Sequence, residues 1–347
     1  MNQAVAATAA AASDLVDALA TCHAQPLWDR YHRVTRRLPA AADAPWHWRW
    51  TDMEPLIGRA CAEVSMEDAE RRVLLLTHPA FAGAVATTTN LSSGLQTLLP
   101  GEVARPHRHA LQAIRYVMEG AGAVTSVNDH RCAMEVGDLV LTPAWTWHEH
   151  IHPGSGRVVW FDGLDLPLCT QLDSMFFEIA TPGAVAVEAL PTRPASLRSD
   201  AVPLAPDACD AALAGASRYR FSGERAREAL RRAPARADGS RLLRYVDGVS
   251  AGAVLPTLDC YLMGLAAGQA TRRCRSTSNA VCVVASGSGR SVVADTVIAW
   301  TANDVFTLPH WNWISHTATS QDAVIFMMTD RELMACMGYL REEESEP

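Results

Sequence analysis

The sequence predicts a mainly β protein in which one β-barrel domain occurs twice, with a helical segment before the first copy and a helical connector before the second. Short β-prone runs separated by Gly, Pro, Asn and Asp fill residues 84–168, and the same texture returns after residue 245. TPAWTWHEH at 142–150 also matches LPHWNWISH at 308–316 at a constant offset of 166 residues. Self-similarity at so long a period indicates a duplicated domain rather than a solenoid.

Four segments are predicted from this pattern. Residues 1–83 form an N-terminal helical segment, in which Ser65 and Asp68 resemble a capping box. Residues 84–183 form the first barrel. Residues 184–245 form the connector, whose GERAREALRRA run predicts a helix, and residues 246–347 form the second barrel.

Composition and charge exclude several classes of protein. The formal net charge of −8 argues against nucleic acid as a partner, because phosphate binding needs a basic face. The nine cysteines occur singly, as expected for buried thiols of a reducing compartment. The alanine-rich N-terminus lacks the basic and hydrophobic regions of a signal peptide, and no window approaches the roughly 20 apolar residues of a membrane span. We therefore expect a cytoplasmic protein without a membrane partner.

Three histidines of the first copy predict a metal site. His107 and His109 are two residues apart on a predicted strand and therefore point to the same face, and His148 lies in the TPAWTWHEH segment. Neutral imidazole suits Fe, Zn, Cu and Ni alike, so the spacing does not name the metal. Three protein ligands leave coordination positions open, which is typical of a catalytic site.

The second copy does not repeat these ligands. The matching positions hold Cys274, Ser276 and Ile314, and an isoleucine cannot bind a metal. One metal per chain is therefore expected. The remaining repeat histidine, His316, is interpreted as a hydrogen-bonded structural residue.

Longer motifs carry a resemblance to a known family. The HxH pair and the later Gly-Pro-His set resemble the two cupin motifs, with Ala113 at the usual glutamate position. The runs GLQTLLPGEVARPHRH, RYVMEGAGAVT, GDLVLTPAWTWHEH and VVWFDGLDLPL resemble the gentisate 1,2-dioxygenase and salicylate 1,2-dioxygenase family, from about residue 25 to the C-terminal REE.

The resemblance implies a bicupin, with two double-stranded β-helix jelly-roll barrels, and one Fe(II) per chain. In that family Fe(II) binds the substrate carboxylate and ortho-hydroxyl together with O2. The C1–C2 bond of the 2-hydroxybenzoate is then cut, and both oxygen atoms are incorporated. A role in aromatic catabolism and a homotetramer are also implied.

Five further residues are candidates for roles in the site, and the resemblance implies the roles of three of them. Arg115 and Arg71 match the family's carboxylate-binding arginines, and His150 matches a histidine near the substrate oxygens that manages a proton. Asp162 would orient His150, and Gln96 would hydrogen-bond a ring substituent or oxygen. Structural alternatives remain open: a surface helix charge for Arg71, a core histidine for His150, a turn cap for Asp162 and a backbone-bonded interior residue for Gln96.

The sequence departs from the family pattern beside the predicted site. Ala110 and Leu111 replace the Thr-Gln or Ser-Gln that usually follows the HxH pair. Ser92 stands where the family tends to carry an aromatic residue, and Gly94 where it often carries Ala. These changes predict a larger, less polar pocket and a salicylate-type substrate, including 5-substituted salicylates such as 5-nitrosalicylate, beside gentisate.

Two other classes of function stay open. A non-oxidative metal-dependent cupin, such as a decarboxylase or isomerase, would share the fold and the three histidines but would not consume O2. A ligand-binding cupin without catalysis would not depend on His107. Oxygen uptake separates these alternatives from the dioxygenase.

Overall fold

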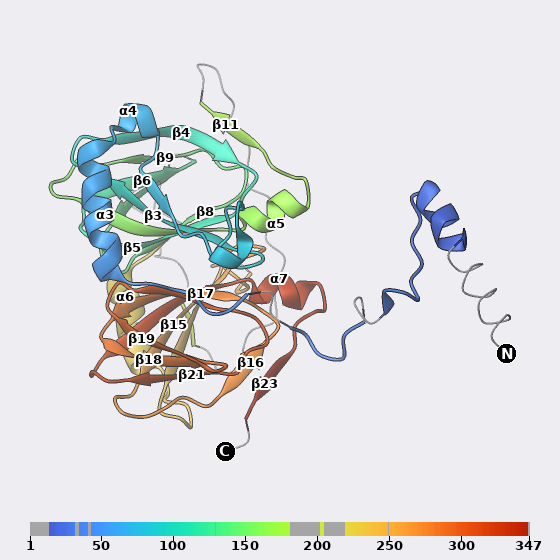
Figure 1. Ribbon diagram of the computed structural model, residues 1–347. Coiled ribbons are helices and arrows are strands. Elements are labelled where there is room, and N and C mark those ends of the chain that lie inside the picture. The colour runs from blue at the N-terminus through green and yellow to red at the C-terminus, as the bar shows by residue number, and fades with distance from the viewer. Residues whose placement is uncertain are drawn as a thin grey trace, which may run out of the picture. The chain divides into compact units, whose positions relative to one another are not determined.

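The computed structural model of the chain describes residues 14–31, 35–40, 43–128, 130–180, 202–204, 219–248 and 250–345. The chain divides into two compact units, Met1–Ala40 and Ala41–Pro347. In the first unit residues 14–21 are helical, and Leu27, Trp28 and Tyr31 are exposed. All the sheets belong to the second unit (Figure 1).

Two sheets form the first barrel. Its strands alternate buried and less buried side chains where one face meets the interior, as in Ala123–Val127. The six-stranded sheet has the order β13 (Arg220–Phe221), β8 (Leu139–Thr142), β5 (Ala113–Glu119), β10 (Val158–Leu164), β3 (Ser92–Leu98) and β2 (Val73–Leu75). The five-stranded sheet has the order β11 (Phe177–Ile179), β4 (Val103–His109), β9 (His148–Ile151), β6 (Ala123–Val127) and β7 (His130–Met134).

The second barrel repeats this arrangement with one more strand. Its seven-stranded sheet has the order β1 (His47–Trp48), β20 (Val305–Leu308), β17 (Ala280–Ser286), β22 (Ala323–Thr329), β15 (Asp259–Leu265), β14 (Arg241–Tyr245) and β12 (Val202–Leu204). Its five-stranded sheet has the order β19 (Thr296–Thr301), β18 (Ser288–Val293), β21 (Ile314–Ala318), β16 (Cys274–Ser276) and β23 (Glu342–Glu344). The predicted mainly β fold is confirmed, while the domain boundaries at 83, 183 and 245 stay a prediction.

The helices are short and peripheral. In the second unit they are α3 (Trp50–Glu63), α4 (Met66–Ala69), the 3-10 helix η1 (Pro79–Phe81), α5 (Leu166–Gln171), α6 (Gly223–Arg232) and α7 (Arg331–Cys336). The helix predicted in GERAREALRRA is α6, and its N-cap Ser222 accepts a hydrogen bond from the backbone N–H of Arg225. In the described part of the chain, none of the helices has the length and apolar character needed to cross a bilayer.

The capping-box prediction is correct at the cap itself but wrong for the residues after Ala69. Ser65 accepts from the backbone N–H of Asp68, as predicted, yet α4 ends at Ala69. Leu74 and its neighbours then form the edge strand β2 instead of continuing a helix. Pairing with β3 supplies hydrogen bonds and packing that outweigh the helical tendency of the ERRVLLL run. Most of the predicted connector, residues 184–201 and 205–218, lies outside the described residues.

The duplication extends to individual hydrogen bonds. The repeat-related residues Gly137 and Asn303 both have a positive φ, of 88° and 69°. The N–H of Gly137 donates to Val117, and that of Asn303 donates to Val284. Because the left-handed conformation favours Gly and Asn, the two copies use the residue types that suit the same turn.

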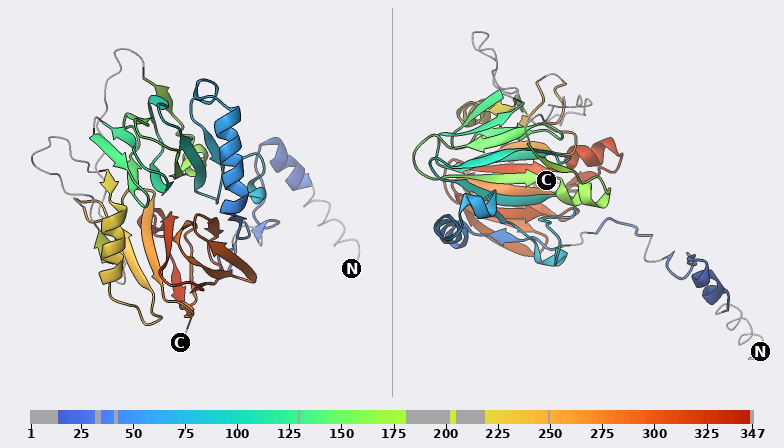
Figure 2. Two further views of the ribbon diagram at one scale, coloured as in Figure 1. Left: turned by 90° about the vertical axis from the view of Figure 1, so that its left-hand side faces the viewer. Right: turned by 90° about the horizontal axis from the view of Figure 1, so that it is seen from above.

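Each barrel also pairs with a short strand that lies, in the sequence, just before the other barrel. Strand β1, just before α3, pairs with β20 of the second barrel, and β13, just before α6, pairs with β8 of the first. The carboxylate of Asp304 accepts the N–H of Trp50 at 2.7 Å, and that of Asp138 accepts the N–H of Gly223 at 2.8 Å. Helices α3 and α6, blue and yellow in Figure 2, therefore begin at equivalent places on opposite sides of the two barrels.

A continuous hydrophobic core joins the larger sheets of the two barrels. Tyr116 of β5 stacks on Phe326 of β22, with ring centroids 4.1 Å apart. Gly163 of β10 lies so close to Met328 that a Cβ added there would be 2.1 Å from the methionine sulfur. The barrels are thus packed back to back through these sheets, which leaves the five-stranded sheets facing outward (Figure 1).

Candidate active site

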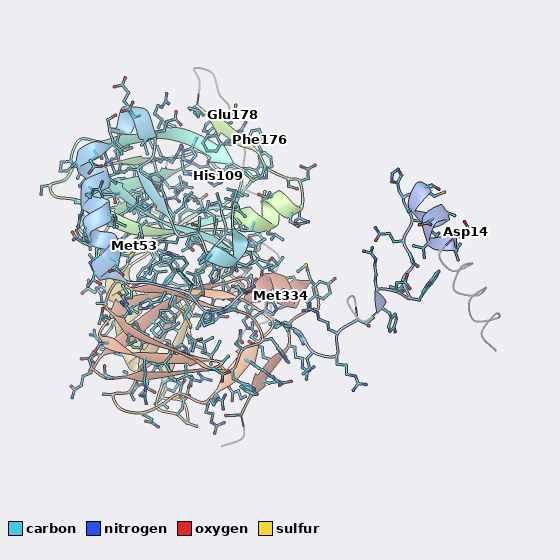
Figure 3. All side chains as sticks on the ribbon, viewed as in Figure 1. Asp14, Met53, His109, Phe176, Glu178 and Met334 are labelled. Atoms are coloured by element: carbon cyan, nitrogen blue, oxygen red, sulfur yellow. The ribbon has the colours of Figure 1, made fainter. Side chains whose placement is uncertain are left out.

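The three predicted ligands converge inside the first barrel. His107 and His109 lie two residues apart on β4, and His148 on β9 is the direct antiparallel partner of His107. All three side chains are buried, and one ring nitrogen of each lies within 4.8 Å of those of the other two. Figure 3 labels His109 within this barrel, near Phe176 and Glu178 of the segment that runs along β4.

Backbone carbonyls fix which nitrogen of each ring faces the centre. Nδ1 of His107, His109 and His148 lies 3.0 Å from the carbonyl oxygens of Arg105, Leu111 and Thr146 in turn. A carbonyl oxygen can only accept, so each Nδ1 carries the hydrogen and each Nε2 keeps its lone pair. The three rings are thus held in the tautomer that a metal ligand needs.

Burial and nearby positive charge keep these imidazoles neutral. Burial, with Arg71 next, lowers the pKa of His107 to about 2. Burial, with Arg115 next, lowers the pKa of His109 to about 4, and burial holds the pKa of His148 well below its usual value. Neutral imidazole is the form that coordinates a metal, so the donor set fits a divalent transition ion.

Arg115 and Asp162 form a buried pair beside the histidines. They lie opposite each other on β5 and β10, with Nε of Arg115 3.4 Å from Oδ1 of Asp162. Arg115 also donates to the hydroxyl of Thr142, and the indole N–H of Trp160 donates to Asp162. Burial raises the pKa of Asp162 to about 6 although Arg115 opposes the shift, so its desolvation is only partly compensated.

The adjacent arginines 71 and 72 have different environments. Arg72 forms a bidentate ion pair with Glu102 and also donates to the carbonyl of Val64, which is a structural role. Arg71 instead lies over the ring of Phe177 at 5.2 Å, and Phe177 stacks on His107 with a centroid distance of 5.3 Å. Arg71 therefore faces the histidines and is not the surface helix charge considered as its alternative.

Strand β3 lies beside Asp162 in the same sheet. Ser92, Gly94 and Gln96 point to one face of this strand, and all three are buried. Gly94 is the direct partner of Asp162 across the β3–β10 pair. A Cβ at Gly94 would lie 2.6 Å from Cγ1 of Val73, so Val73 occupies the space next to the glycine. The expectation that Gly94 enlarges the pocket is therefore wrong, and Ser92 alone supports it.

His150 lies two residues beyond His148 on the same face of β9. Its Nδ1 is 2.8 Å from the hydroxyl of Thr125, which pairs with it across β6 and β9. The expectation that Asp162 orients His150 is wrong, because Thr125 holds the ring and Asp162 bonds to Trp160 instead. Nε2 of His150 has no hydrogen-bond partner among the described residues, and burial and then Arg115 hold the pKa of His150 well below its usual value.

Several buried polar atoms of this region lack a hydrogen-bond partner among the described residues. They are Nε2 of His148, Nε2 of His150, Nε of Arg71, Nε of Arg115 and Nε2 of Gln96. Leaving a buried donor or acceptor unsatisfied costs about 1–3 kcal/mol each, so native proteins rarely gather five of them in one place. Such a cluster indicates that a metal and a polar ligand complete the site.

Comparisons with known proteins agree with this geometry. Residues 94–164 match the family described as "Cupin domain". The chain is 34% identical to gentisate 1,2 dioxygenase 1 of Aquipseudomonas alcaligenes over 92% of each chain. It is 32% identical to 5-aminosalicylate 1,2-dioxygenase of Comamonas sp, covering 94% of this chain and 88% of that one.

A solved structure supports the same conclusion. Salicylate 1,2-dioxygenase of Pseudoaminobacter salicylatoxidans, crystallised as adducts with gentisate, superposes with a TM-score of 0.83 at 27% identity, covering 96% of this chain and 94% of that one. The chain belongs to the gentisate and salicylate 1,2-dioxygenase family. The predicted family and bicupin fold are thus confirmed, and the protein is a ring-cleaving dioxygenase.

The structure adds residues to this dioxygenase site that the sequence did not reveal. Phe177, Val73, Trp160 and Thr125 all contact predicted site residues, but each is an apolar, indole or hydroxyl side chain without a metal-ligating or charged group that would single it out in the sequence. Only Thr125 had a usable signal, since it falls on Ser291 at the repeat offset of 166, opposite the repeated histidine.

Proposed function

We propose that this dioxygenase holds one Fe(II) with His107, His109 and His148 and cleaves the C1–C2 bond of a 2-hydroxybenzoate, incorporating both atoms of O2. The observation that carries this proposal is the convergence of three neutral imidazoles beside the buried guanidinium group of Arg115 and the partly buried one of Arg71. Neutral ligands leave the charge of a divalent ion uncompensated, which favours a dianionic substrate. The metal, when bound, would supply electron transfer between the aromatic ring and O2.

Arg115 and Arg71 bind the substrate carboxylate in this proposal. Both have an unsatisfied Nε, and they lie close enough for each to lower the pKa of His107 and of His109. A guanidinium offers paired N–H donors that match a carboxylate. Asp162 acts through Arg115. The indole N–H of Trp160 donates to the Asp162 carboxylate, and this carboxylate in turn forms the ion pair that positions Arg115.

His150 accepts the proton of the substrate's 2-hydroxyl group, and Gln96 hydrogen-bonds a substrate oxygen or ring substituent. Support comes from their unsatisfied Nε2 atoms, of which that of His150 can accept and that of Gln96 can donate. Both residues are buried, so water does not compete for these atoms.

The substrate class is the salicylate type, including 5-substituted salicylates such as 5-nitrosalicylate, as well as gentisate. Ser92 supports this choice because its small side chain leaves room beside Gln96 and Gly94. Val73 sets the limit of that room, since it covers Gly94. Ranking gentisate, salicylate and 5-nitrosalicylate by kcat/KM tests the choice, and a strong preference for gentisate over the other two would contradict it.

The proposed activity is tested by O2 uptake with anaerobically Fe(II)-reconstituted protein and each of these three acids. Uptake should match substrate loss and should vanish in His107→Ala. The matched control is Ser276→Ala, since Ser276 takes the place of His109 in the second barrel, and this variant should keep full activity. Absence of uptake with all three acids would instead favour a non-oxidative cupin.

We further propose that the enzyme is a cytoplasmic homotetramer. Leu27, Trp28 and Tyr31 of the first unit have exposed fractions of 55%, 64% and 59%, and large apolar side chains gathered on one short segment are typical of an interface. Light scattering of the purified protein tests the assembly, and a monomer would contradict it.

A further inference from the structure

Thr125 connects His150 to a sulfur atom on the next strand. The Thr125 hydroxyl on β6 lies 2.8 Å from Nδ1 of His150 on β9, and it donates to the sulfur of Met134 on β7 at 3.1 Å. All three side chains are completely buried, so water does not enter this chain of contacts. The three residues form a relay from β7 to the active site.

The sulfur of Met134 determines the direction of the hydrogen bonds. A thioether has no hydrogen to give and can only accept, so the single hydrogen of the Thr125 hydroxyl points to Met134. The hydroxyl oxygen must then accept from His150. The hydrogen of the His150 ring therefore lies on Nδ1, and Nε2 keeps its lone pair.

The second barrel contains an equivalent relay, but a hydrogen-bond donor stands where the first barrel has the accepting sulfur of Met134. Ser291 pairs with His316 as Thr125 pairs with His150, and its hydroxyl lies 2.7 Å from Nδ1 of His316. At the repeat position of Met134 stands Trp300, whose indole N–H donates to the Ser291 hydroxyl at 2.9 Å.

An indole N–H can only donate, so Ser291 uses one lone pair to accept from Trp300. Among the described residues, Nδ1 of His316 is the acceptor left for the hydrogen of the Ser291 hydroxyl. The ring hydrogen of His316 is then on Nε2. The two repeat-related histidines are thus expected in opposite tautomers, because an acceptor in one barrel is a donor in the other.

The charges around His150 favour the same tautomer as the relay. Arg115 and Arg71 both act on its ring, and the proposed metal ligands His107 and His148 are close, with ring centroids 6.5 and 5.9 Å away. A lone pair at Nε2 is attracted to such a positive region, whereas an N–H there would be repelled. For His316, burial is the cause of the lowered pKa.

We infer that Thr125 and Met134 are positioning residues that hold the hydrogen of His150 on Nδ1, so that the lone pair of Nε2 is available to accept a hydrogen bond from the substrate's hydroxyl group. The inference rests on the role proposed for His150.

The tautomers are tested directly by neutron diffraction from deuterated, anaerobic Fe(II)-loaded crystals. Deuterium is expected on Nδ1 of His150 and on Nε2 of His316. Deuterium on Nε2 of His150, or on the same nitrogen of both rings, would overturn the inference. This measurement needs no turnover and is therefore independent of whether the proposed activity is correct.

The kinetic test uses variants that keep the shape of the relay. Thr125→Val removes the hydroxyl, and Met134→Leu removes the acceptor, so both should lose the fixed tautomer and lower kcat by about ten- to a hundredfold. Thr125→Ser should restore kcat to within about threefold, because it retains the hydroxyl. KM for the hydroxybenzoate and the iron content should stay unchanged in all three variants.

Ser291→Ala is the matched control, since it removes the equivalent hydroxyl from the second barrel and should leave kcat at the wild-type value. Equal rates for Thr125→Val and the wild type would overturn the inference. So would equal losses of kcat in Thr125→Val and Thr125→Ser. If the wild type itself consumed no O2 with hydroxybenzoates, the proposed function would fail, while the neutron result would still decide the tautomer.

Discussion

The two barrels of this dioxygenase share one scaffold and differ at its centre. The pairs His107 with His148 and Cys274 with Ile314 occupy the same register between equivalent strands. The outer ion pairs are also repeated, since Arg108 binds Glu178 as Arg275 binds Glu343. Beyond the ligands, three polar residues of the first site are replaced in the second barrel: Arg115 by Cys282, Asp162 by Met327 and Gln96 by Met263.

The comparison shows that the barrel does not need the metal in order to form. The second barrel keeps the turns and the helix-binding aspartate, yet its cavity of about 130 Å³ is lined by Met263, Ile314 and Met327 together with charged side chains such as Arg331 and Glu342. At the positions of Arg115, Asp162 and Gln96 it has sulfur-containing side chains, which removes the cost of burying those polar groups. The turns and strands that both barrels share therefore determine the fold, and a small set of interior side chains determines the chemistry.

The largest effect is expected when a metal-ligand position is exchanged between the barrels, because this changes the chemistry of a barrel without changing its fold. His148→Ile places the second barrel's residue in the first, and we expect iron per chain to fall to near zero and O2 uptake to fall by at least about a thousandfold. The reverse change, Ile314→His, should bind no iron, because Cys274 and Ser276 do not complete the ligand set. Iron content by elemental analysis checks both, and a folded, iron-loaded His148→Ile variant would refute the assignment.

The next test replaces the charged pair of the first barrel, Arg115 and Asp162, with uncharged side chains, as in the second barrel. Arg115→Met should lower kcat/KM by about a hundredfold, mainly through KM, because the substrate carboxylate loses a charged partner. It should also lower the free energy of unfolding by about 3 kcal/mol, because Asp162 is left as an uncompensated buried carboxylate.

Adding Asp162→Met to this variant should recover most of the stability and none of the activity. Chemical denaturation and steady-state kinetics measure the two effects separately. Recovery of activity in the double variant would show that Arg115 does not bind substrate.

A smaller effect is expected at Gly94, where the second barrel has Tyr261. Gly94→Ala should reduce the free energy of unfolding by about 1–3 kcal/mol, since its Cβ would lie 2.6 Å from Cγ1 of Val73. Val73→Ala in the same chain should relieve the clash. A double-mutant cycle followed by urea denaturation checks the coupling, and additive losses would mean that Val73 does not fill this space.

The smallest effect concerns the pH dependence of the two helix-binding aspartates. Burial opposes ionisation of Asp304, but hydrogen bonds from His47 and from backbone N–H groups outweigh it and lower its pKa below 3.8. Burial raises the pKa of Asp138 above 3.8, with only partial compensation by the N–H of Gly223 and by Arg220. The repeat-related carboxylates are therefore shifted in opposite directions.

Opposite pKa shifts give opposite pH profiles of stability. A lowered pKa contributes stability that is present above 3.8 and is lost as the pH falls through the folded-state value, so the cost of Asp304→Asn should grow with pH over that window. A raised pKa contributes stability that is present below 3.8 and is lost as the pH rises through the folded-state value, so the cost of Asp138→Asn should shrink. Denaturation of each variant and the wild type at several pH values measures both slopes, and slopes of the same sign would contradict the prediction.

Much of this protein was determined by the sequence itself. The repeat offset between Trp145, Trp147 and their copies predicted the duplicated barrel, because turns and strand registers must recur when the same fold recurs. The HxH spacing predicted two ligands on one face of a strand, and Ile314 showed that the second copy has lost this ligand. These conclusions depend on local spacing and residue type, both of which are visible along the chain.

Other features were decided only by the tertiary structure. The family resemblance pointed to Arg71, but the residue types of the adjacent Arg71 and Arg72 do not explain why it is Arg71 that faces the histidines. Their environments depend on Glu102 and Phe177, which lie far away in the sequence. The filling of the space at Gly94 depends on the register of β2 against β3, and the tautomer of His150 depends on β6 and β7. Contacts of this kind arise from the packing of several strands at once, so no single segment of the sequence contains them.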